Sequence, residues 1–304
     1  MSVYKKSKLL KSHRVEKGIS REKLSEGICD STTLKRYENE GMIPSDENYR
    51  MLQEKMGGRP EQIIMSYDMG LFVDIDRYQE YEDLLMNHKI DELRMKTELL
   101  KAGLKNIKSV EKEQFLGRLD SLVKDKYTES SLKELENLLV KSVPDYKDGF
   151  FSVTRLYNDT ELFLLNDIAI TYEELGGIDI SLSMFDKLDI YLEQAEDNKD
   201  SLGAVKILFN YASELGRNKK YEKAMEICRK GIRLIKKNSI QEMLYAFAFN
   251  IGWIYFQMWT ESKSSEYRDL AKEYVELSLA MVKYLDESPI NAETIENFYN
   301  ENFS

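Results

Sequence analysis

The sequence is poor in residues that interrupt helices and in residues that bind metals. Its 304 residues include only four prolines and 15 glycines. Because proline removes a backbone donor and glycine favours irregular backbone, this scarcity indicates a nearly all-helical protein. Two cysteines are too few for a disulfide framework, and two histidines, His13 and His88, are too few for an ordinary zinc site. We expect Cys29 and Cys228 to be small packed side chains.

Long apolar runs and catalytic constellations are also lacking. No stretch of about 18 apolar residues exists to span a membrane, and the lysine-rich N-terminus carries no apolar run of signal-peptide length. This pattern predicts a cytoplasmic protein with no membrane partner. The sequence has no Gly-rich phosphate loop and no Ser–His–Asp set. We therefore expect neither an enzyme nor a bound cofactor or metal.

Charge is divided unevenly along the chain. Residues 1–38 carry ten Lys or Arg against five Asp or Glu, a balance of +5. Residues 67–304 carry 31 against 44, a balance of −13. A basic head on an acidic body is typical of a head that binds a polyanion and a body that does not. The length allows a short domain followed by a repeat array.

Two short helices joined by a tight turn are predicted near the N-terminus. Ser20 is placed to cap the first helix, and Gly27 permits the sharp exit from it. Asp30 is placed to cap the second helix, whose apolar residues Leu34 and Tyr37 face inward. The outer face of that helix carries short hydroxyls followed by two cations, which suits a DNA major groove. The predicted DNA-reading residues are Ser31, Thr32, Thr33, Lys35 and Arg36. From spacing alone, an ordinary solvated helical hairpin remains the alternative.

The flanking segments complete a small domain. Residues 4–17 are predicted to form a helix that offers Leu9, Leu10 and Val15 to the core of this head. A helix after the next loop closes the same core with Tyr49, Leu52 and Met56. Residues 57–60, Gly-Gly-Arg-Pro, are the best break in the chain.

Beyond about residue 74, the pattern predicts one amphipathic helix after another, over 78–102, 108–125 and 130–142. The C-terminal half then shows an internal period. A small residue precedes a large apolar one by three positions in the segments 168–172, 211–215 and 251–255. Small residues let paired helices approach closely, and adjacent pairs must stack to bury their apolar faces, as in a solenoid.

The period is longer than that of a standard repeat. Its spacings of 43 and 40 residues exceed the roughly 34 of a tetratricopeptide repeat. We therefore expect longer connecting loops, one of them within 257–270. The pattern resembles degenerate tetratricopeptide repeats, and residues 150–284 support this best.

One face of such a stack is predicted to bind a ligand. The first helix of each hairpin lines the concave side, where Asn210 and Asn250 stand in register and Asn166 is displaced by one position. An Asn amide can hold both the N–H and the C=O of an extended peptide, so this ladder suits a bound peptide. Neighbouring side chains suited to peptide side chains are Phe163, Lys206, Phe209, Phe249, Trp253 and Gln257. Asn at such positions can also bond a neighbouring helix, and aromatic residues at helical spacing also pack in cores.

Residues 4–57 resemble the helix-turn-helix of the Xre/repressor class. The matching residues are Gly18-Ile19-Ser20, Leu24, Leu34, Tyr37-Glu38, Gly41 and Pro44-Ser45. The Leu24-to-Leu34 spacing and the Gly27-Ile28-Cys29 turn are more similar to the peptide-pheromone-sensing regulators of Gram-positive bacteria, the Rgg/PlcR/PrgX type. That class often has Gln just after the cap of its second helix. Here Arg21 takes that place, so a DNA contact from Arg21 would be ionic and less specific.

This resemblance implies an all-α chain with two domains. Residues 1–66 would be a helix-turn-helix DNA-binding domain with linker, and residues 67–304 a tetratricopeptide-like solenoid that binds ligand and dimerises. The implied function is a cytoplasmic, homodimeric transcription regulator that binds double-stranded DNA and a short quorum-sensing peptide, held largely by Asn166, Asn210 and Asn250. Three alternatives remain: a body that docks a partner protein, a body that senses a small metabolite, and an enzyme with a vestigial head.

Overall fold

The protein is all-α, as predicted. Apart from one isolated antiparallel bridge between Lys147 and Phe150, the described residues form helices, turns and loops only. No described helix is both long and apolar enough to cross a membrane. The computed structural model describes residues 10–56 and 80–303, with gaps at 12–13, 16, 40–41, 43, 83, 86, 88, 105–109, 125–126, 156, 195–201, 239–242 and 286–288. The predicted boundary at residues 66–67 lies outside them.

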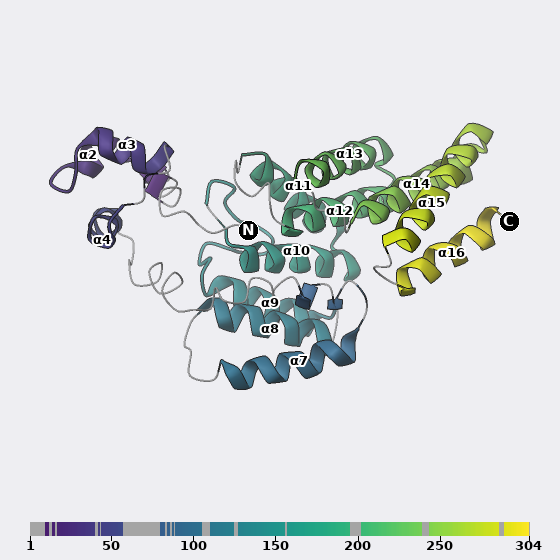
Figure 1. Ribbon diagram of the computed structural model, residues 1–304, viewed down its shortest axis with the longest axis horizontal. Coiled ribbons are helices and arrows are strands. Elements are labelled where there is room, and N and C mark those ends of the chain that lie inside the picture. The colour runs from purple at the N-terminus through teal and green to yellow at the C-terminus, as the bar shows by residue number, and fades with distance from the viewer. Residues whose placement is uncertain are drawn as a thin grey trace.

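Three labelled helices form the N-terminal head (Figure 1). They are α2 (Arg21–Ser25), α3 (Ser31–Asn39) and α4 (Asp46–Lys55). The core that they share is predominantly aliphatic and is fully or nearly fully buried. Its members are Leu10, Leu24, Leu34, Tyr37, Tyr49, Leu52 and Met56. Leu9 lies outside the described residues. Val15 is expected in this core, but it lies at the end of the helical segment, just before the turn at residues 17–18, and is 60% exposed to solvent.

The turn chemistry of the head matches the sequence prediction. The Ser20 hydroxyl accepts the backbone N–H of Lys23 at 3.2 Å and so caps α2. Gly27 has a φ of +76°, a left-handed conformation that disfavours side chains. Asp30 Oδ1 accepts the backbone N–H of Thr33 at 2.7 Å, which caps α3. Ser20 therefore fixes the start of α2, and Gly27 and Asp30 fix the turn that leads into α3.

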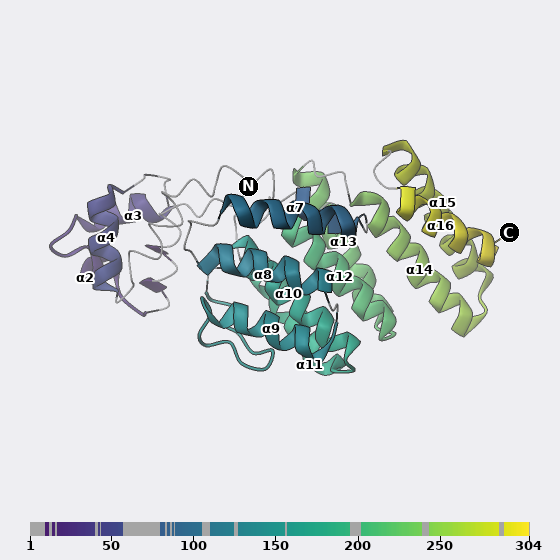
Figure 2. The same cartoon turned by 90° about the horizontal axis from the view of Figure 1, so that it is seen from below.

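The rest of the described chain is a stack of helical hairpins (Figures 1 and 2). Its labelled helices are α7 (Ile90–Gly103), α8 (Val110–Lys124), α9 (Glu129–Val140), α10 (Asp159–Glu174), α11 (Ile178–Gln194), α12 (Leu202–Arg217), α13 (Tyr221–Asn238), α14 (Leu244–Ser262), α15 (Ser265–Leu285) and α16 (Pro289–Phe303). The single helix predicted over 78–102 is wrong. Asn87 lies in a turn, the Lys89 backbone N–H donates to Leu84 at 2.9 Å, and α7 begins only at Ile90.

The three predicted C-terminal hairpins are α10–α11, α12–α13 and α14–α15. The long loop expected within 257–270 is wrong. The helix α14 continues to Ser262, Lys263 ends it in a left-handed conformation with φ of 58°, and α15 begins at Ser265. The connection between these two helices is therefore short, and the helices themselves have 19 and 21 residues.

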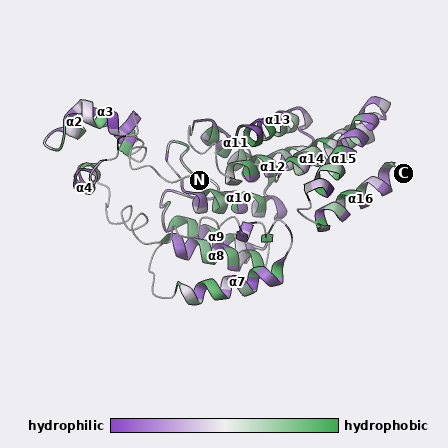
Figure 3. Cartoon of the chain, in the orientation of Figure 1, coloured by the Kyte–Doolittle hydropathy of each residue, from purple (hydrophilic) through white to green (hydrophobic). Residues whose placement is uncertain are grey.

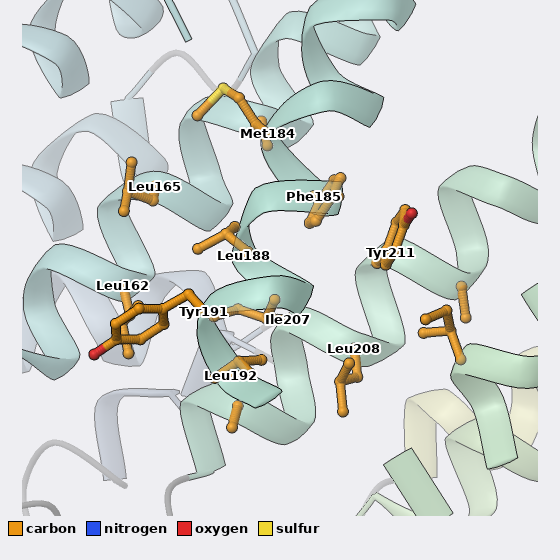
Figure 4. Packing of buried hydrophobic residues seen from close by; sticks show 14 of the residues in the cluster. Leu162, Leu165, Met184, Phe185, Leu188, Tyr191, Leu192, Ile207, Leu208 and Tyr211 are labelled. Atoms are coloured by element: carbon orange, nitrogen blue, oxygen red, sulfur yellow. The ribbon is translucent and has the colours of Figure 1, made fainter. Parts of the chain in front are cut away.

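Amphipathic helices pack these hairpins together. Figure 3 shows hydrophilic and hydrophobic residues on the same helices, and the main core runs from α9 to α14. At its centre, Phe185 of α11 stacks on Tyr211 of α12 with ring centroids 5.5 Å apart (Figure 4). Burial of such side chains contributes roughly 1.5–3 kcal/mol each, so the array is stabilised from hairpin to hairpin.

One glycine of the periodic motif sets the spacing between α14 and α15. A Cβ added to Gly252 would lie 2.8 Å from Cγ2 of Val275 and 3.1 Å from the backbone oxygen of Ala271. The small residue at this repeat position is therefore required by close helix packing, as the sequence pattern predicts.

Replacing Gly252 by Ala should destabilise the protein even though Ala favours helices. The gain in helix propensity of about 1 kcal/mol is outweighed by overpacking that costs about 1–3 kcal/mol. We expect a lower midpoint in thermal unfolding followed by circular dichroism. Gly103→Ala is the matched control: a Cβ there meets nothing within 4 Å, so that variant should be as stable as wild type or more so. Equal effects of the two substitutions would contradict the packing argument.

Candidate functional site

The outer face of α3 presents the residues predicted to read DNA. Lys35, Arg36 and Thr32 are exposed, and Ser31 is half-buried. The Thr33 hydroxyl donates to Oδ2 of Asp30 at 2.8 Å, so it takes part in capping the helix. Two exposed cations that follow the exposed hydroxyl of Thr32 on one helix form a surface suited to phosphates and base edges.

Arg21 has a structural partner within the head. Its Nε donates to Oε2 of Glu38 at 2.6 Å, and Arg14 Nε donates to Oε1 of the same carboxylate at 2.6 Å. The Glu38 side chain is fully buried, whereas one third of the Arg21 side chain is exposed. Arg21 therefore braces α2 against α3. A DNA contact from its exposed part stays a prediction.

A cavity of about 320 Å³ opens among the helices of the body. It lies between α8, α10 and α12 on one side and α14 and α16 on the other. Most of its wall is apolar, with a few polar groups, which is the usual composition of a ligand pocket. Its lining residues are Leu85, Arg118, Leu122, Tyr127, Asp167, Ile170, Lys206, Phe209, Asn210, Met243, Tyr245, Ala246, Phe249, Asn291, Thr294 and Ile295.

A buried network of four charges forms one wall of the cavity. Arg118 donates through Nε to Oδ2 of Asp167 at 2.5 Å and through both terminal nitrogens to Glu82. Lys206 Nζ donates to Oε2 of Glu82. The side chains of Arg118 and Glu82 are each 1% exposed. The guanidinium also lies 4.7 Å from the ring centroid of Phe163, a cation–π contact.

The electrostatics of this network stabilise the ionised form of Glu82. Burial alone would raise the pKa of that carboxyl, but the charges and hydrogen bonds of Arg118 and Lys206 outweigh burial and lower the pKa to about 2. Burial and the nearby Asp167 raise the pKa of the adjacent Tyr127 to about 12. The network at the cavity wall therefore keeps Glu82 ionised at neutral pH.

The predicted asparagine ladder is only partly in the cavity. Asn210 lines the cavity, and its Nδ2 donates to Oδ1 of Asn166 at 2.9 Å. Asn166 is fully buried and donates to Oδ1 of Asp167 at 3.0 Å. Asn250 is 5% exposed and donates to the Ser213 hydroxyl at 3.0 Å. These amides therefore link successive first helices, which is the structural role that the sequence left open.

The other predicted ligand residues divide in the same way. Lys206, Phe209 and Phe249 line the cavity. Phe163 is 4% exposed and packs beneath Arg118 and Lys206. Trp253 and Gln257 are half-buried on α14 and are not part of the cavity lining. Whether any of them binds a ligand stays a prediction.

Sequence reasoning found Lys206 but missed the other charged residues of the network, Arg118, Asp167 and Glu82. Arg118 lies on the apolar face of α8 that also carries Phe115 and Leu122, and Asp167 interrupts the apolar run before Ile168. A charge on an apolar helix face must be paired when buried, and this signal was present in the sequence. The described part of the chain contains no group of His, Cys, Asp and Glu side chains arranged to hold a metal.

Comparison with known proteins gives likeness in structure only. No protein-family model matches the chain, and no curated protein matches it significantly by sequence. PlcR from Bacillus thuringiensis, crystallised with the peptide PapR7 and DNA, is 22% identical with a TM-score of 0.58, over 96% of this chain and 99% of that one.

Two ComR structures are similar over the same extent. Apo ComR from Streptococcus vestibularis has 14% identity and a TM-score of 0.57, over 98% of both chains. ComR from S. thermophilus, with DNA and its signalling peptide ComS, has 14% identity and a TM-score of 0.53, over 98% of this chain and 99% of that one. The chain has the PlcR and ComR fold. The predicted architecture, a helix-turn-helix head followed by a tetratricopeptide-like body, is confirmed.

Removing one charge of the cavity wall should destabilise the body in a pH-dependent way. Glu82→Gln leaves Arg118 and Lys206 with Asp167 alone, and breaking a buried ion pair costs about 3–5 kcal/mol. Because the pKa of Glu82 is lowered from 4.5 to about 2, its contribution is full above about pH 4.5 and is lost as the pH falls toward 2. The difference in unfolding midpoint between variant and wild type should therefore shrink from pH 7 to pH 3.

Glu113→Gln is the matched control for this measurement. Glu113 pairs with Lys141 at 2.8 Å on the surface, where both side chains are about half exposed. Such pairs contribute about 0–1 kcal/mol. A loss in Glu82→Gln no larger than in this control would contradict the importance of the network.

Proposed function

We propose that this chain is a DNA-binding transcription regulator whose repeat domain binds a short signalling peptide and thereby alters DNA binding. The observation that supports this most is the extent of the structural likeness. It includes both the head and the body of PlcR, a protein crystallised with a peptide and DNA together. The exposed Thr32, Lys35 and Arg36 of α3 supply a surface for DNA, and the cavity among α8, α10, α12, α14 and α16 supplies one for the ligand.

The same proposal includes the cellular setting. A regulator of this kind acts in the cytoplasm, as a homodimer whose two heads read a two-fold-related DNA site, and carries out no catalysis. Ligand binding would shift an equilibrium between two arrangements of the body. The repeat array is suited to such a shift because its hairpins pack mainly on their neighbours.

A small metabolite is the second candidate ligand, and the size of the cavity favours it. A volume of about 320 Å³ lies near the lower end of the roughly 300–1,000 Å³ typical of small-molecule pockets. A peptide of several residues would fill the cavity with one or two side chains and extend beyond it. Peptide and metabolite therefore differ in whether residues outside the lining contribute to binding.

Substitutions on α3 test the DNA-binding half of the proposal. Lys35→Ala with Arg36→Ala should strongly weaken retardation of a duplex selected from random DNA by the wild-type protein, with circular dichroism unchanged. The dependence of log affinity on log salt should also flatten, by roughly 0.9 for each phosphate contact removed. Arg50→Ala on α4, whose guanidinium faces Glu54 at 3.7 Å, is the control. Unchanged binding by the double variant would refute α3 as the DNA-reading helix.

Substitutions around the cavity test the ligand half. Synthetic peptides would be made from short secreted reading frames of the same genome, and binding measured by fluorescence polarisation. Asn210→Ala removes an amide contact of about 1–3 kcal/mol, so the affinity should fall by roughly 5- to 150-fold. Gln257→Ala, outside the lining, separates the candidates: a weakened affinity there would show a peptide that extends along α14. A ligand that binds without altering DNA retardation would refute a regulatory role.

A further inference from the structure

The charges in the cavity wall already balance one another. Arg118 is bound to two carboxylates, Glu82 and Asp167, so these three groups together carry a charge of −1. Lys206, which also donates to Glu82, brings the sum to zero. Of the two cations, Lys206 is the more accessible, with 14% of its side chain exposed against 1% for Arg118.

We infer that the cavity accepts an uncharged group of its ligand and that Lys206 is the residue that determines this specificity. The inference deepens the proposed function, on which it rests, by naming the class of ligand group that enters the wall.

An anionic ligand group would disturb the balance. A ligand carboxylate could share the Lys206 ammonium with Glu82, but the network and the ligand group would then carry a net charge of −1 beside the almost fully buried Arg118 and Glu82. Uncompensated charge in such surroundings is strongly unfavourable. The pairing of Lys206 therefore works against an anion, although a lysine at a pocket wall at first indicates an anion site.

A cationic ligand group meets the opposite difficulty. Glu82 already accepts from Arg118 and Lys206, and Asp167 accepts from Arg118 and Asn166. A ligand ammonium would approach two cations whose carboxylate partners are already hydrogen-bonded. Only removal of Lys206 would leave a negative charge for such a ligand to neutralise.

The remainder of the lining matches a neutral guest. Phe209, Phe249 and Ile295 supply apolar surface. Asn210 supplies an uncharged amide, and Asn291 donates to the Tyr245 hydroxyl at 2.8 Å. A neutral side chain or amide can thus be desolvated here without leaving a buried charge unpaired.

Three small probes with the same benzyl side chain test this inference on the full chain at about pH 6. They are N-acetyl-phenylalaninamide, N-acetyl-phenylalanine and phenylalaninamide, which carry charges of 0, −1 and +1 at that pH. Dissociation constants from ligand-observed NMR should be at least tenfold lower for the neutral probe than for either charged one. Phe249→Ala, in the cavity wall, should weaken its binding.

Lys206→Met should shift the relative affinities of the three probes in favour of the cationic one. The buried sum becomes −1, so phenylalaninamide should gain at least tenfold over N-acetyl-phenylalanine relative to their ratio in wild type. Lys230→Met is the matched control, because Lys230 pairs with Asp189 and with Glu193 at 2.8 Å, away from the cavity lining. The control should keep the wild-type ranking.

The inference is overturned if the wild-type protein binds the anionic or cationic probe as well as the neutral one. It is equally overturned if no probe binds, or if Phe249→Ala leaves binding unchanged. The wild-type ranking decides this even if Lys206→Met does not fold. If the neutral probe binds best but no peptide alters DNA binding, the proposed function is refuted and the inference stands. If a peptide alters DNA binding but a charged probe binds as well as the neutral one, the inference is refuted and the proposed function stands.

Discussion

The body of the protein depends on the fully buried guanidinium of Arg118. Removing a guanidinium from water costs several kcal/mol, and this cost is offset only because Glu82 and Asp167 meet it with three hydrogen bonds. Those partners come from different parts of the fold: the segment before α7, and α10. Through Glu82 the network also reaches Lys206 on α12. One buried charge therefore fixes four segments around the cavity.

The network also connects two points of the cavity lining through buried side chains. A continuous path of hydrogen bonds leads from Asn210 to Asn166, Asp167, Arg118, Glu82 and Lys206. Asn210 and Lys206, at its two ends, both line the cavity. A ligand that changes either end acts on groups that are buried and fully engaged, so small displacements cannot be absorbed by water. Because Glu82 belongs to the segment at 80–85, the same path reaches the residues before α7.

The sequence predicts the fold better than the site, and particular residues show why. Helix pairing follows from local patterns such as the cap at Ser20 and the close approach at Gly252, which neighbouring residues determine. The site requires contacts between residues far apart in the chain. Lys206 and Glu82 are separated by 124 positions, and α16 contributes Asn291 and Ile295 to the cavity without any repeat signature. The asparagine register was visible in the sequence, but the sequence left open whether these amides bond a neighbouring helix or a ligand.

In both the head and the body, the role of a basic residue depends on whether a buried carboxylate binds it. In the head, Arg14 and Arg21 are bound to the buried carboxylate of Glu38, while Lys35 lies exposed on α3. In the body, Lys206 is bound to Glu82. A cation held by a buried carboxylate stabilises the protein, and recruiting it for a ligand would leave that carboxylate uncompensated. Exposed cations bind a polyanion without this penalty. A basic residue in the sequence thus indicates a charged partner only when no internal carboxylate holds it.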